Sequence, residues 1–459
     1  MNKAEVFYKD IGDYLSREEK LKIVKDAKSI ISPALQMTQI KPNEHGDWIS
    51  MRNSKFDEFI PLEPVYKFDN RTQSFFTLYS LGTATNRDAW VYNFSGAELR
   101  KNIKKTIAHY NEQLALLASG KIKEPIYDST KGSWTRDWLN HIKRNVEFSE
   151  NNAEYRFSLY RPFVKMNTYF DDDLNQERYQ LPKLFPENDK DNLLICVTGI
   201  GSTKPFCTFI SDIIPCLDLV DKSQCFPLYW YEKKEKVQAG LFEKTEDEYI
   251  RRDGISNFIL EQANTRYGPK VTKQDIFYYV YGILHSPDYR KTFANDLKKM
   301  LPRLPLVERA ADFWAFSKAG RNLAEVHLGY EEQEPPKGVL INGKPVSRTP
   351  FPASQLEVNK MAFPAKGQKG TIVYNSYLTI SNIPPKAYEY VVNGKSAIEW
   401  VMERYAVATH KESGIRNDPN DWAKEHGNPQ YILDLLLSVI SVSMKTVEIV
   451  AGLPKVEWE

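Results

Sequence analysis

The 459 residues of this chain exceed what one hydrophobic core usually organises, so length alone predicts two or three packed units. Hydrophobic residues make up 42% and charged residues 27%, which is the balance of a folded globular protein and excludes a largely disordered one. The net charge is only +2, so the chain as a whole does not attract nucleic acid, and any contact with DNA must come from local basic groups.

The sequence pattern shows no targeting or membrane segment. The chain starts without an apolar run behind a basic segment, and its longest apolar stretch, residues 431–450, is interrupted by Asp434, Lys445 and Glu448. A secretory signal needs such a run, and a membrane span needs about 20 residues largely without charge. We therefore expect a cytoplasmic protein.

Four cysteines lie within one short region of the chain: Cys196, Cys207, Cys216 and Cys225. Their spacings are far from the paired C-x-x-C of zinc sites, and no clustered histidines complete them. Buried thiols are the preferred interpretation and a zinc site is the alternative.

The first 60 residues predict a short strand at residues 6–8 and a charged helix at residues 16–27. This segment supplies little core of its own, and strands in an open α/β sheet need neighbours that it does not provide. It is typical of the tail of a domain whose body lies elsewhere.

Residues 74–94 are strand-like, with runs at residues 75–79 and 89–92. A helix is predicted directly afterwards, because Ser95 and Glu98 form a capping-box pair and apolar residues then recur at helical spacing. Its basic side chains lie off the apolar face: Arg100, Lys101, Lys104 and Lys105. They form either a solvated face or a set of phosphate contacts.

The middle of the chain changes from strands to helices. Short β runs separated by turn residues predict a β-rich module, at residues 155–160, 193–197, 206–210 and 226–231. A helical block is predicted from residue 245 to about residue 330, with Thr272 and Asp275 capping one helix and Ser286-Pro287 ending it. The next helix should present Tyr289, Phe293, Leu297 and Met300 on one face.

The last third combines β runs over residues 339–383 with helices at residues 396–405 and 431–450. Ser396 and Glu399 repeat the capping-box pair. The whole chain is therefore predicted to be a mixed α+β protein, with a β-rich module, a helical block and a C-terminal α+β part.

Several catalytic motifs are absent from the sequence. No G-x-x-x-x-G-K-[ST] string is present to cradle the phosphates of ATP, and no D/N-P-P-Y/F string or glycine-rich cofactor loop is present for amino-methyl transfer. A metal-dependent nuclease can be built from Asp218, Glu232 and Lys234, but such loose spacing arises by chance in a chain with 27% charged residues.

Residues 198–204, TGIGSTK, form the most suggestive loop, because two glycines can expose backbone N–H groups to an anion. The loop departs from G-x-G-x-x-G, since Lys204 stands where the third glycine should be and a strand follows it. A tight turn without a ligand and a DNA phosphate contact are both left open.

Seven strings, in the same order along the chain, resemble the C-terminal part of Type ISP restriction-modification enzymes. In this family, one polypeptide carries nuclease, translocase, adenine methyltransferase and target-recognition regions. The strings lie at residues 8–16 (YKDIGDYLS), 85–93 (TNRDAWVYN), 160–163 (YRPF), 224–229 (QCFPLY), 275–281 (DIFYYVY), 284–287 (LHSP) and 392–401 (VNGKSAIEWV).

The resemblance implies a chain that begins after the methyltransferase motifs and spans the target-recognition region. It implies four segments: residues 1–70 as a methyltransferase tail and linker, 71–240 as the β-rich recognition module, 241–335 as the helical block, and 336–459 as the α+β end of the specificity domain. Double-stranded DNA and the other regions of the parent polypeptide would be the partners. S-adenosylmethionine, ATP and Mg²⁺ would belong to those other regions, in a bacterial defence system against phage.

Recognition of a DNA sequence needs phosphate contacts, which fix the register, and polar contacts to base edges, which read the sequence. The candidate DNA-binding residues combine basic and amide or hydroxyl groups: Asn86, Arg87, Arg161, Lys165, Ser202, Thr203, Lys204 and Gln224. Arg161 can instead pair with a core carboxylate. The large aromatic residues are expected in the core: Trp90, Phe163, Trp230 and Trp400.

Two other functions stay open at this point. The chain could be a protein-interaction or spacer module that couples the methyltransferase to the translocase, for which the helical block is suited. It could also be the nuclease described above, which would require metal-dependent cutting that Glu232→Ala abolishes.

Overall fold

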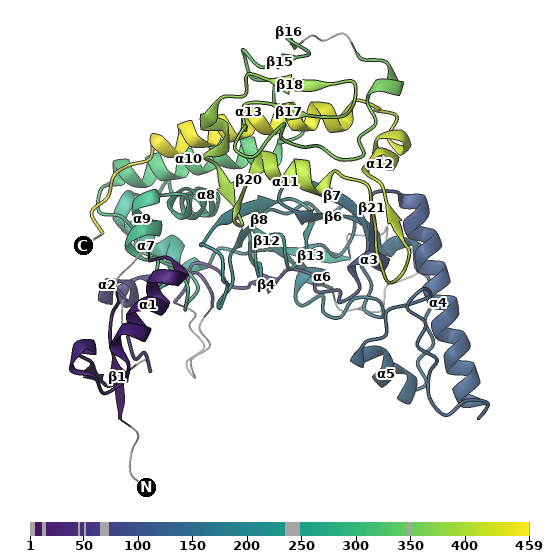
Figure 1. The fold of residues 1–459 in the computed structure, drawn as a ribbon, viewed down its shortest axis with the longest axis horizontal. Helices are drawn as coiled ribbons and strands as arrows, with labels where there is room; N and C mark the ends of the chain where they lie inside the picture. The colour runs from purple at the N-terminus through teal and green to yellow at the C-terminus, as the bar shows by residue number, and fades with distance from the viewer. Residues whose placement is uncertain are drawn as a thin grey trace. The chain divides into compact units, whose positions relative to one another are not determined.

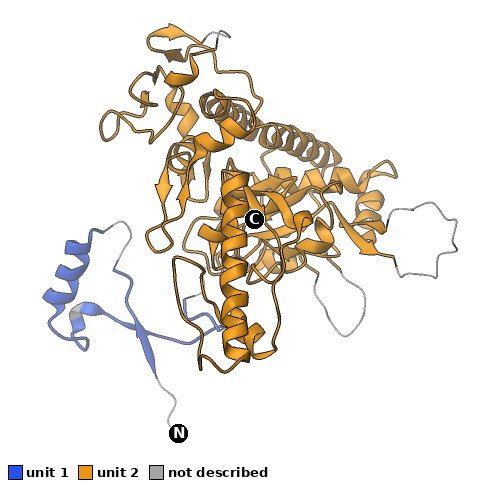
Figure 2. Ribbon diagram, turned by 90° about the vertical axis from the view of Figure 1, so that its right-hand side faces the viewer, with its two compact units in different colours: residues 1–53 blue, residues 54–459 orange. Residues whose placement is uncertain are grey.

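The structure of the chain is a computed structural model that describes residues 5–11, 15–44, 46–49, 52–64, 73–234, 248–346 and 350–458. It divides into two compact units, residues 1–53 and residues 54–459, which Figure 2 shows in blue and orange. The boundaries predicted after residues 70 and 240 lie outside the described residues, and so does residue 245, where the helical block was expected to begin. Residues 249–253, which were expected to be helical, form a strand, so the described helices of the block begin only at Asn257. The boundary after residue 335 falls within the second unit and stays a prediction.

The first unit pairs two short strands antiparallel, β1 (Val6–Tyr8) and β2 (Thr38–Ile40), with α1 (Arg17–Ala27) and η1 (Pro33–Leu35) between them. Ser16 begins α1 with a complete capping box, in which its hydroxyl accepts from the Glu19 N–H. Ala27 is the buried residue of α1. The predicted strand and helix are confirmed, and this unit has little core.

The second unit is organised around an antiparallel sheet in the order β4-β11-β8-β9. These strands are β4 (Ser80–Leu81), β8 (Leu194–Val197), β9 (Thr208–Ser211) and β11 (Gln224–Pro227). Every residue of β8, β9 and β11 is buried. Because side chains alternate along a strand, this sheet contributes side chains to two hydrophobic cores, one on each of its faces. Leu194, Cys196, Phe209 and Cys225 enter one core, and Ile195, Val197, Ile210 and Phe226 enter the other.

A second sheet, in the order β10-β6-β7-β5, borders the first core. Its strands are β5 (Tyr92–Asn93), β6 (Tyr155–Arg161), β7 (Val164–Tyr169) and β10 (Ile214–Pro215), and β12 (Tyr229–Lys233) and β13 (Tyr249–Asp253) form a separate hairpin. The helices of this region are α3 (Asp88–Val91), α4 (Gly96–Ala118), α5 (Arg136–Lys143), η2 (Asn152–Glu154) and α6 (Leu181–Leu184).

The helical block covers the other core. It contains α7 (Asn257–Tyr267), α8 (Lys273–Leu284), α9 (Pro287–Thr292) and α10 (Ala310–Leu328), next to α2 (Ser54–Glu58) and the paired strands β3 (Ile60–Pro61) and β14 (Arg303–Leu304). The axes of α8 and α10 approach closely at Gly320, where a Cβ would lie 1.9 Å from the Tyr278 carbonyl oxygen. This crossing therefore needs glycine.

In the C-terminal part, α13 (Tyr431–Ala451) runs beside α10, with a four-stranded sheet on its other side (Figure 1). That sheet, in the order β16-β15-β18-β17, consists of β15 (Leu340–Ile341), β16 (Lys344–Pro345), β17 (Ile372–Val373) and β18 (Thr379–Ser381). The remaining elements are η3 (Ala353–Gln355), η4 (Pro385–Tyr388), β19 (Val391–Val392), β20 (Lys395–Ser396), α11 (Ala397–Arg404), β21 (Ala408–Thr409), β22 (Arg416–Asn417) and α12 (Pro419–Glu425). No helix among the described residues is both long and apolar enough to cross a lipid bilayer.

The predicted α+β class is confirmed, and so are the β runs at residues 155–160 and 193–197 and the capping boxes at Thr272 and Ser396. Trp90, Phe163 and Trp400 are buried as expected, and Trp230 is partly buried.

Three predictions about local structure are wrong. Residues 89–92 were expected to be extended, but α3 begins at Asp88 and only Tyr92 joins a strand, because Thr85 bonds to both the Asp88 carboxylate and the Arg87 N–H and closes a turn. Residues 75–79 form no regular strand, and only Phe76 makes a β-bridge, to Ile255. The helix expected through Met300 ends at Thr292.

The capping box expected at Ser95 is half formed. The Ser95 hydroxyl accepts from the Glu98 N–H at 3.0 Å, but the Ser95 N–H donates to the Asn93 amide oxygen at 2.9 Å, not to Glu98. The Ser95 hydroxyl also donates to the Glu425 carboxylate at 2.6 Å. This helix start is therefore held by a residue 330 positions further along the chain.

Two histidines are buried where α8, α10 and α13 meet. The His327 Nδ1 lies 2.6 Å from the Tyr281 hydroxyl, and its Nε2 lies 2.9 Å from the Thr446 hydroxyl. Burial, reinforced by the charge of Arg290, lowers the pKa of His327 to about 3 and the pKa of His285 well below its usual range. Both imidazoles are therefore neutral in the folded protein at neutral pH.

We expect acidification to destabilise the fold through these histidines. Below pH of about 6.5, the unfolded chain binds a proton at each imidazole and the folded chain does not, so the free energy of unfolding falls by about 1.4 kcal/mol per pH unit for each histidine. For His327 the fall continues toward pH 3. Between pH 7.5 and 5.5, His327→Gln should remove about 1.4 kcal/mol of the decrease measured by urea unfolding.

His410→Gln is the matched control, because the His410 side chain is exposed on the hairpin of β21 and β22. It should leave the pH dependence as in the unaltered chain. An identical decrease in the unaltered chain and in His327→Gln would contradict the assignment.

Candidate nucleic-acid interface

A cleft of about 760 Å³ opens on the second unit, between segments that are far apart in the sequence. Its walls come from residues 86–94, residues 127–134, Tyr160 with the start of β7, and residues 403–417. Polar side chains and aromatic rings both line it. Two of the candidate residues, Asn86 and Arg87, belong to its wall.

The hairpin of β21 and β22 is fixed to the opposite part of the cleft by amide groups. The Asn417 side-chain oxygen accepts from the Phe94 N–H at 2.9 Å, and the Asn93 side chain donates to the Arg416 carbonyl at 3.2 Å. At the tip, Ser129 donates to the Glu412 carbonyl at 3.3 Å. The cleft thus has a defined width.

Asn86 lies exposed in the turn that precedes α3. It adopts a positive φ of 53°, which asparagine tolerates better than most residues, and its side chain donates to the Gln176 amide oxygen at 3.2 Å. Its amide is therefore accessible at the cleft wall.

Arg87, by contrast, is buried. Its guanidinium donates to the Thr135 hydroxyl at 2.5 Å and to the Asp173 carbonyl at 3.5 Å, and it lies 4.4 Å from the centre of the Trp138 ring. Burial lowers the pKa of Arg87 to about 10, so it stays charged at neutral pH. These contacts tie the turn at Asn86 to α5.

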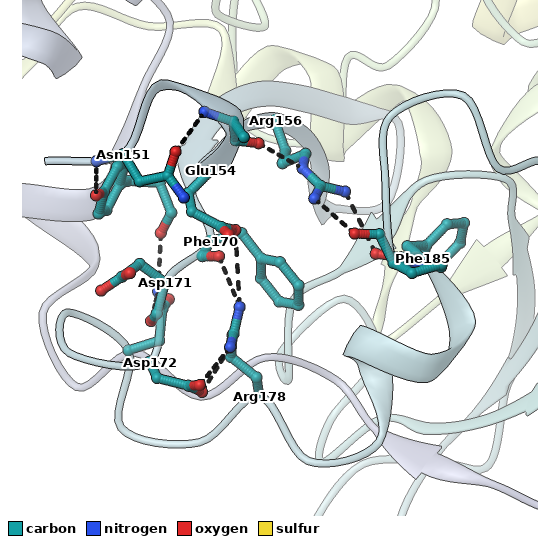
Figure 3. A network of polar contacts seen from close by, with 12 residues as sticks. Asn151, Glu154, Arg156, Phe170, Asp171, Asp172, Arg178 and Phe185 are labelled. Carbon is teal, nitrogen blue, oxygen red and sulfur yellow. Dashed lines mark hydrogen bonds and ion pairs between the residues drawn. The ribbon is translucent and has the colours of Figure 1, made fainter. Parts of the chain in front are cut away.

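The turn at Asn86 rests on the loop of residues 170–178, whose polar network Figure 3 shows. Arg178 donates to the Asp172 carboxylate at 2.7 Å and to the Phe170 carbonyl at 3.0 Å, and it lies 3.7 Å from Glu154. The Asp171 carboxylate accepts from the Asp173 N–H at 2.8 Å. The loop then pairs with the turn through a β-bridge between Ala84 and Glu177. The cleft wall therefore has a rigid support.

Arg161 is joined to the same wall through Asp88. Its guanidinium lies 3.8 Å from the Asp88 carboxylate, 3.6 Å from the Asp218 carboxylate and 3.9 Å from the centre of the Tyr160 ring. The Tyr160 hydroxyl donates to Asp88 at 3.0 Å. The structure thus brings Asn86, Arg87 and Arg161 together, with Arg161 between two carboxylates.

Lys165 lies elsewhere. Val164 and Met166 face the cleft, so the alternation along β7 turns Lys165 to the other side, where it pairs with Glu331. Lys165 is therefore separated from the wall that carries Asn86.

The glycine loop and Gln224 form a second group. Gly199 donates to the Asp221 carbonyl at 2.9 Å, and the Ser202 hydroxyl donates to the Asp221 carboxylate at 2.6 Å. Lys222 donates back to the Gly201 carbonyl at 2.9 Å, and the Gln224 side chain donates to the Lys222 carbonyl at 3.1 Å. The polar groups of the loop are thus mainly used to hold it against residues 221–224.

The C-terminal end of this loop is more exposed to solvent than the part that bonds to residues 221–224. Thr203 and Lys204 are both exposed. They follow a turn in which the Lys204 N–H donates to the Ser202 hydroxyl at 3.0 Å. These two side chains are the part of the loop that can meet another molecule.

The cysteines are buried, as expected, with the Cys196 and Cys225 sulfur atoms 3.6 Å apart. Burial raises the pKa of Cys216 to about 11, so its thiol stays protonated and is a poor metal ligand. Within the described ranges, no three His, Cys, Asp or Glu side chains gather as a metal site. The carboxylates proposed for a nuclease face different arginines, Asp218 facing Arg161 and Glu232 facing Arg252 at 2.9 Å.

The sequence does not single out the hairpin of β21 and β22, although its tip lines the cleft. His410 and Lys411 are exposed there, and Arg416 is 62% exposed and paired with the buried Asp418. The polar run HKESG, ending in a Gly414 with a φ of 69°, is the signal of a turn. No local pattern in that run indicates that the hairpin contacts residues about 300 positions earlier in the chain.

Comparison with known proteins identifies the family. Residues 74–435 match the family described as the Type ISP C-terminal specificity domain, and the chain belongs to this family. No relative was found among curated proteins.

Three solved structures are similar over nearly the whole chain. A nuclease-deletion mutant of the Type ISP restriction-modification enzyme LlaGI, in complex with a DNA substrate mimic, has a TM-score of 0.82 and 36% identity, covering 98% of this chain and 33% of that one. The ATP-dependent Type ISP enzyme LlaBIII bound to DNA has a TM-score of 0.84 and 36% identity, covering 99% and 28%. The DrdV–DNA complex has a TM-score of 0.78 and 28% identity, covering 98% and 43%. The chain thus spans about a third of the LlaGI and LlaBIII chains.

Gly199→Ala should destabilise the second unit, because a Cβ there would lie 2.2 Å from the Lys222 carbonyl oxygen. Displacing that backbone should cost about 1–3 kcal/mol of unfolding free energy, measured by urea unfolding. Gly370→Ala is the control, since the nearest atom to its Cβ would be 3.9 Å away. Equal stability of the two variants would show that the loop is not held as described.

Proposed function

We propose that this chain recognises a specific sequence in double-stranded DNA and directs adenine-N6 methylation and restriction by a Type ISP enzyme. The observation that carries the proposal is the likeness, over 98–99% of the chain at 36% identity, to two Type ISP enzymes with DNA or a DNA mimic. Membership in the specificity-domain family supports the same conclusion.

The cleft, together with exposed side chains of the hairpin that borders it, offers both kinds of group that DNA recognition needs. An exposed amide at Asn86 can pair with a base edge, since asparagine matches the hydrogen-bonding edge of adenine in the major groove. Lys411 and Arg416, on the facing hairpin, can contact phosphates. Arg87 and Arg161, which are held by ring and carboxylate contacts, would instead position the wall.

We propose that the chain performs no catalysis by itself. Its sequence holds neither the P-loop nor the methyltransferase strings. S-adenosylmethionine, ATP and Mg²⁺ would bind other regions of the parent polypeptide. A spacer that couples those regions without reading bases is the alternative function.

The proposal is tested by selecting bound duplexes from a random pool at a stated salt concentration, with the chain alone and as part of a complete Type ISP polypeptide. We expect one sequence to be enriched in the complete polypeptide. Binding without enrichment in both forms would favour the spacer, and metal-dependent cutting by the chain alone would favour the nuclease.

Asn86→Gly removes the amide but keeps the backbone conformation, because glycine also adopts a positive φ. If Asn86 reads a base, this variant should lose about 1–3 kcal/mol of discrimination at one base pair, measured by competition between the selected duplex and its single-base variants.

Asn382→Gly is the control, with a φ of 60° and a side chain outside the cleft lining. It should discriminate as the unaltered chain does. If Asn86→Gly discriminates between the duplexes as well as the unaltered chain does, Asn86 does not read a base.

A further inference from the structure

Residues 96–146, here called the basic arm, concentrate the positive charge of the chain. They comprise α4, the segment that follows it, and α5, and they hold ten Lys and Arg against five Asp and Glu, a net charge of +5. The other residues hold 52 against 55, a net charge of −3. The net charge of +2 for the whole chain is therefore the sum of one strongly basic segment and a slightly acidic remainder.

All ten basic side chains of the arm are exposed. Three pair with nearby carboxylates, namely Lys101 with Glu98, Lys104 with Glu150 and Lys131 with Asp128. Arg100 donates to Asn152 and lies over the Tyr155 ring. The other six make no ion pair with any residue that the structure describes: Lys105, Lys121, Lys123, Arg136, Lys143 and Arg144.

A small aromatic cluster, which Phe148 completes just beyond the end of the arm, fixes the shape of the arm. The Tyr110 ring stacks on the Phe148 ring at 3.6 Å between centres, and the Trp138 ring meets both edge-on. The Tyr110 hydroxyl donates to the Val146 carbonyl at 2.9 Å, and the Gln113 side chain accepts from the Ile126 N–H at 2.9 Å. The basic side chains are therefore mounted on an ordered backbone, which lowers the entropy cost of binding.

The arm continues directly from the cleft. Tyr127, Ser129 and Trp134 belong to both, and the Tyr127 side chain is 60% exposed. Figure 1 shows the C-terminal half of α4 and α5 extending beyond the sheets. If a DNA duplex contacted the cleft through its base edges, its phosphate backbone would approach the exposed Lys and Arg side chains of the arm.

We propose that the basic arm binds the phosphate backbone of double-stranded DNA without reading its sequence. This inference rests on the proposed function and assigns the phosphate contacts to the arm and the base contacts to the cleft. Lys and Arg that neutralise phosphates release condensed counterions, so such binding weakens steeply with salt. An acidic protein surface is the other class of partner that the same charge could meet.

The test neutralises three unpaired lysines together, Lys105→Gln, Lys121→Gln and Lys123→Gln. Affinity is measured by fluorescence anisotropy at several salt concentrations, for the selected target duplex and for a scrambled duplex of equal length. For each of these lysines that contacts a phosphate, the slope of log affinity against log salt should become shallower by about 0.9. The loss of affinity should be equal for both duplexes.

The control neutralises three exposed lysines of the C-terminal part, Lys360→Gln, Lys366→Gln and Lys386→Gln, and should keep the slope of the unaltered chain. Urea unfolding confirms that both variants are folded. An unchanged slope in the arm variant, or a loss restricted to the target duplex, overturns the proposal. If neither the chain nor the complete Type ISP polypeptide discriminates between the duplexes, the proposed function fails, whereas the slope still decides the role of the arm.

Discussion

The β4-β11-β8-β9 sheet is buried on both of its faces, and the remainder of the second unit depends on this burial. Alternate side chains of β8, such as Cys196 and Val197, enter different cores, so the sheet joins the helical block to the β10-β6-β7-β5 sheet and the C-terminal part. A shift of one residue in its register would exchange the two sets of side chains. Packing against both faces of the sheet therefore fixes the register of its strands.

This frame explains why the cleft can be assembled from distant segments. The turn at Asn86 rests on the loop held by Arg178, and the hairpin of β21 and β22 is bonded to Asn93 and Phe94. Each segment has its own attachment to an ordered element. The cleft geometry therefore depends on these hydrogen bonds between segments, some of which are made by residues that line the cleft, such as Asn417 and Ser129.

Local features of the fold could be predicted from the sequence, and features that depend on distant contacts could not. The caps at Thr272 and Ser396 are local, because the cap and its partner lie three residues apart. The Ser95 cap is shared with Glu425, which no local pattern reveals. The extended structure expected at residues 89–92 is replaced by α3, because the Thr85 side chain closes a turn there.

The same limit applies to the candidate residues. The sequence shows that Arg87 is charged, but Thr135 and Trp138, which cover it, come about fifty residues later. Asn86 and Lys204 are exposed as a binding residue must be, whereas Lys165 is turned away from the cleft. The sequence pattern drew attention to only four charges of the basic arm, all on one helix, and the exposure of its ten basic side chains is visible only in the structure.

Under the proposed function, the separate attachment of the cleft segments has a consequence for how such a protein can acquire a new target. Side chains at the Asn86 turn and at the tip of the β21–β22 hairpin can be exchanged while Arg178, Asn93 and Asn417 keep the backbone in place. Because the arm would hold any duplex, a variant in transition between two targets would still retain DNA. Retargeting could therefore proceed one base pair at a time without loss of the scaffold.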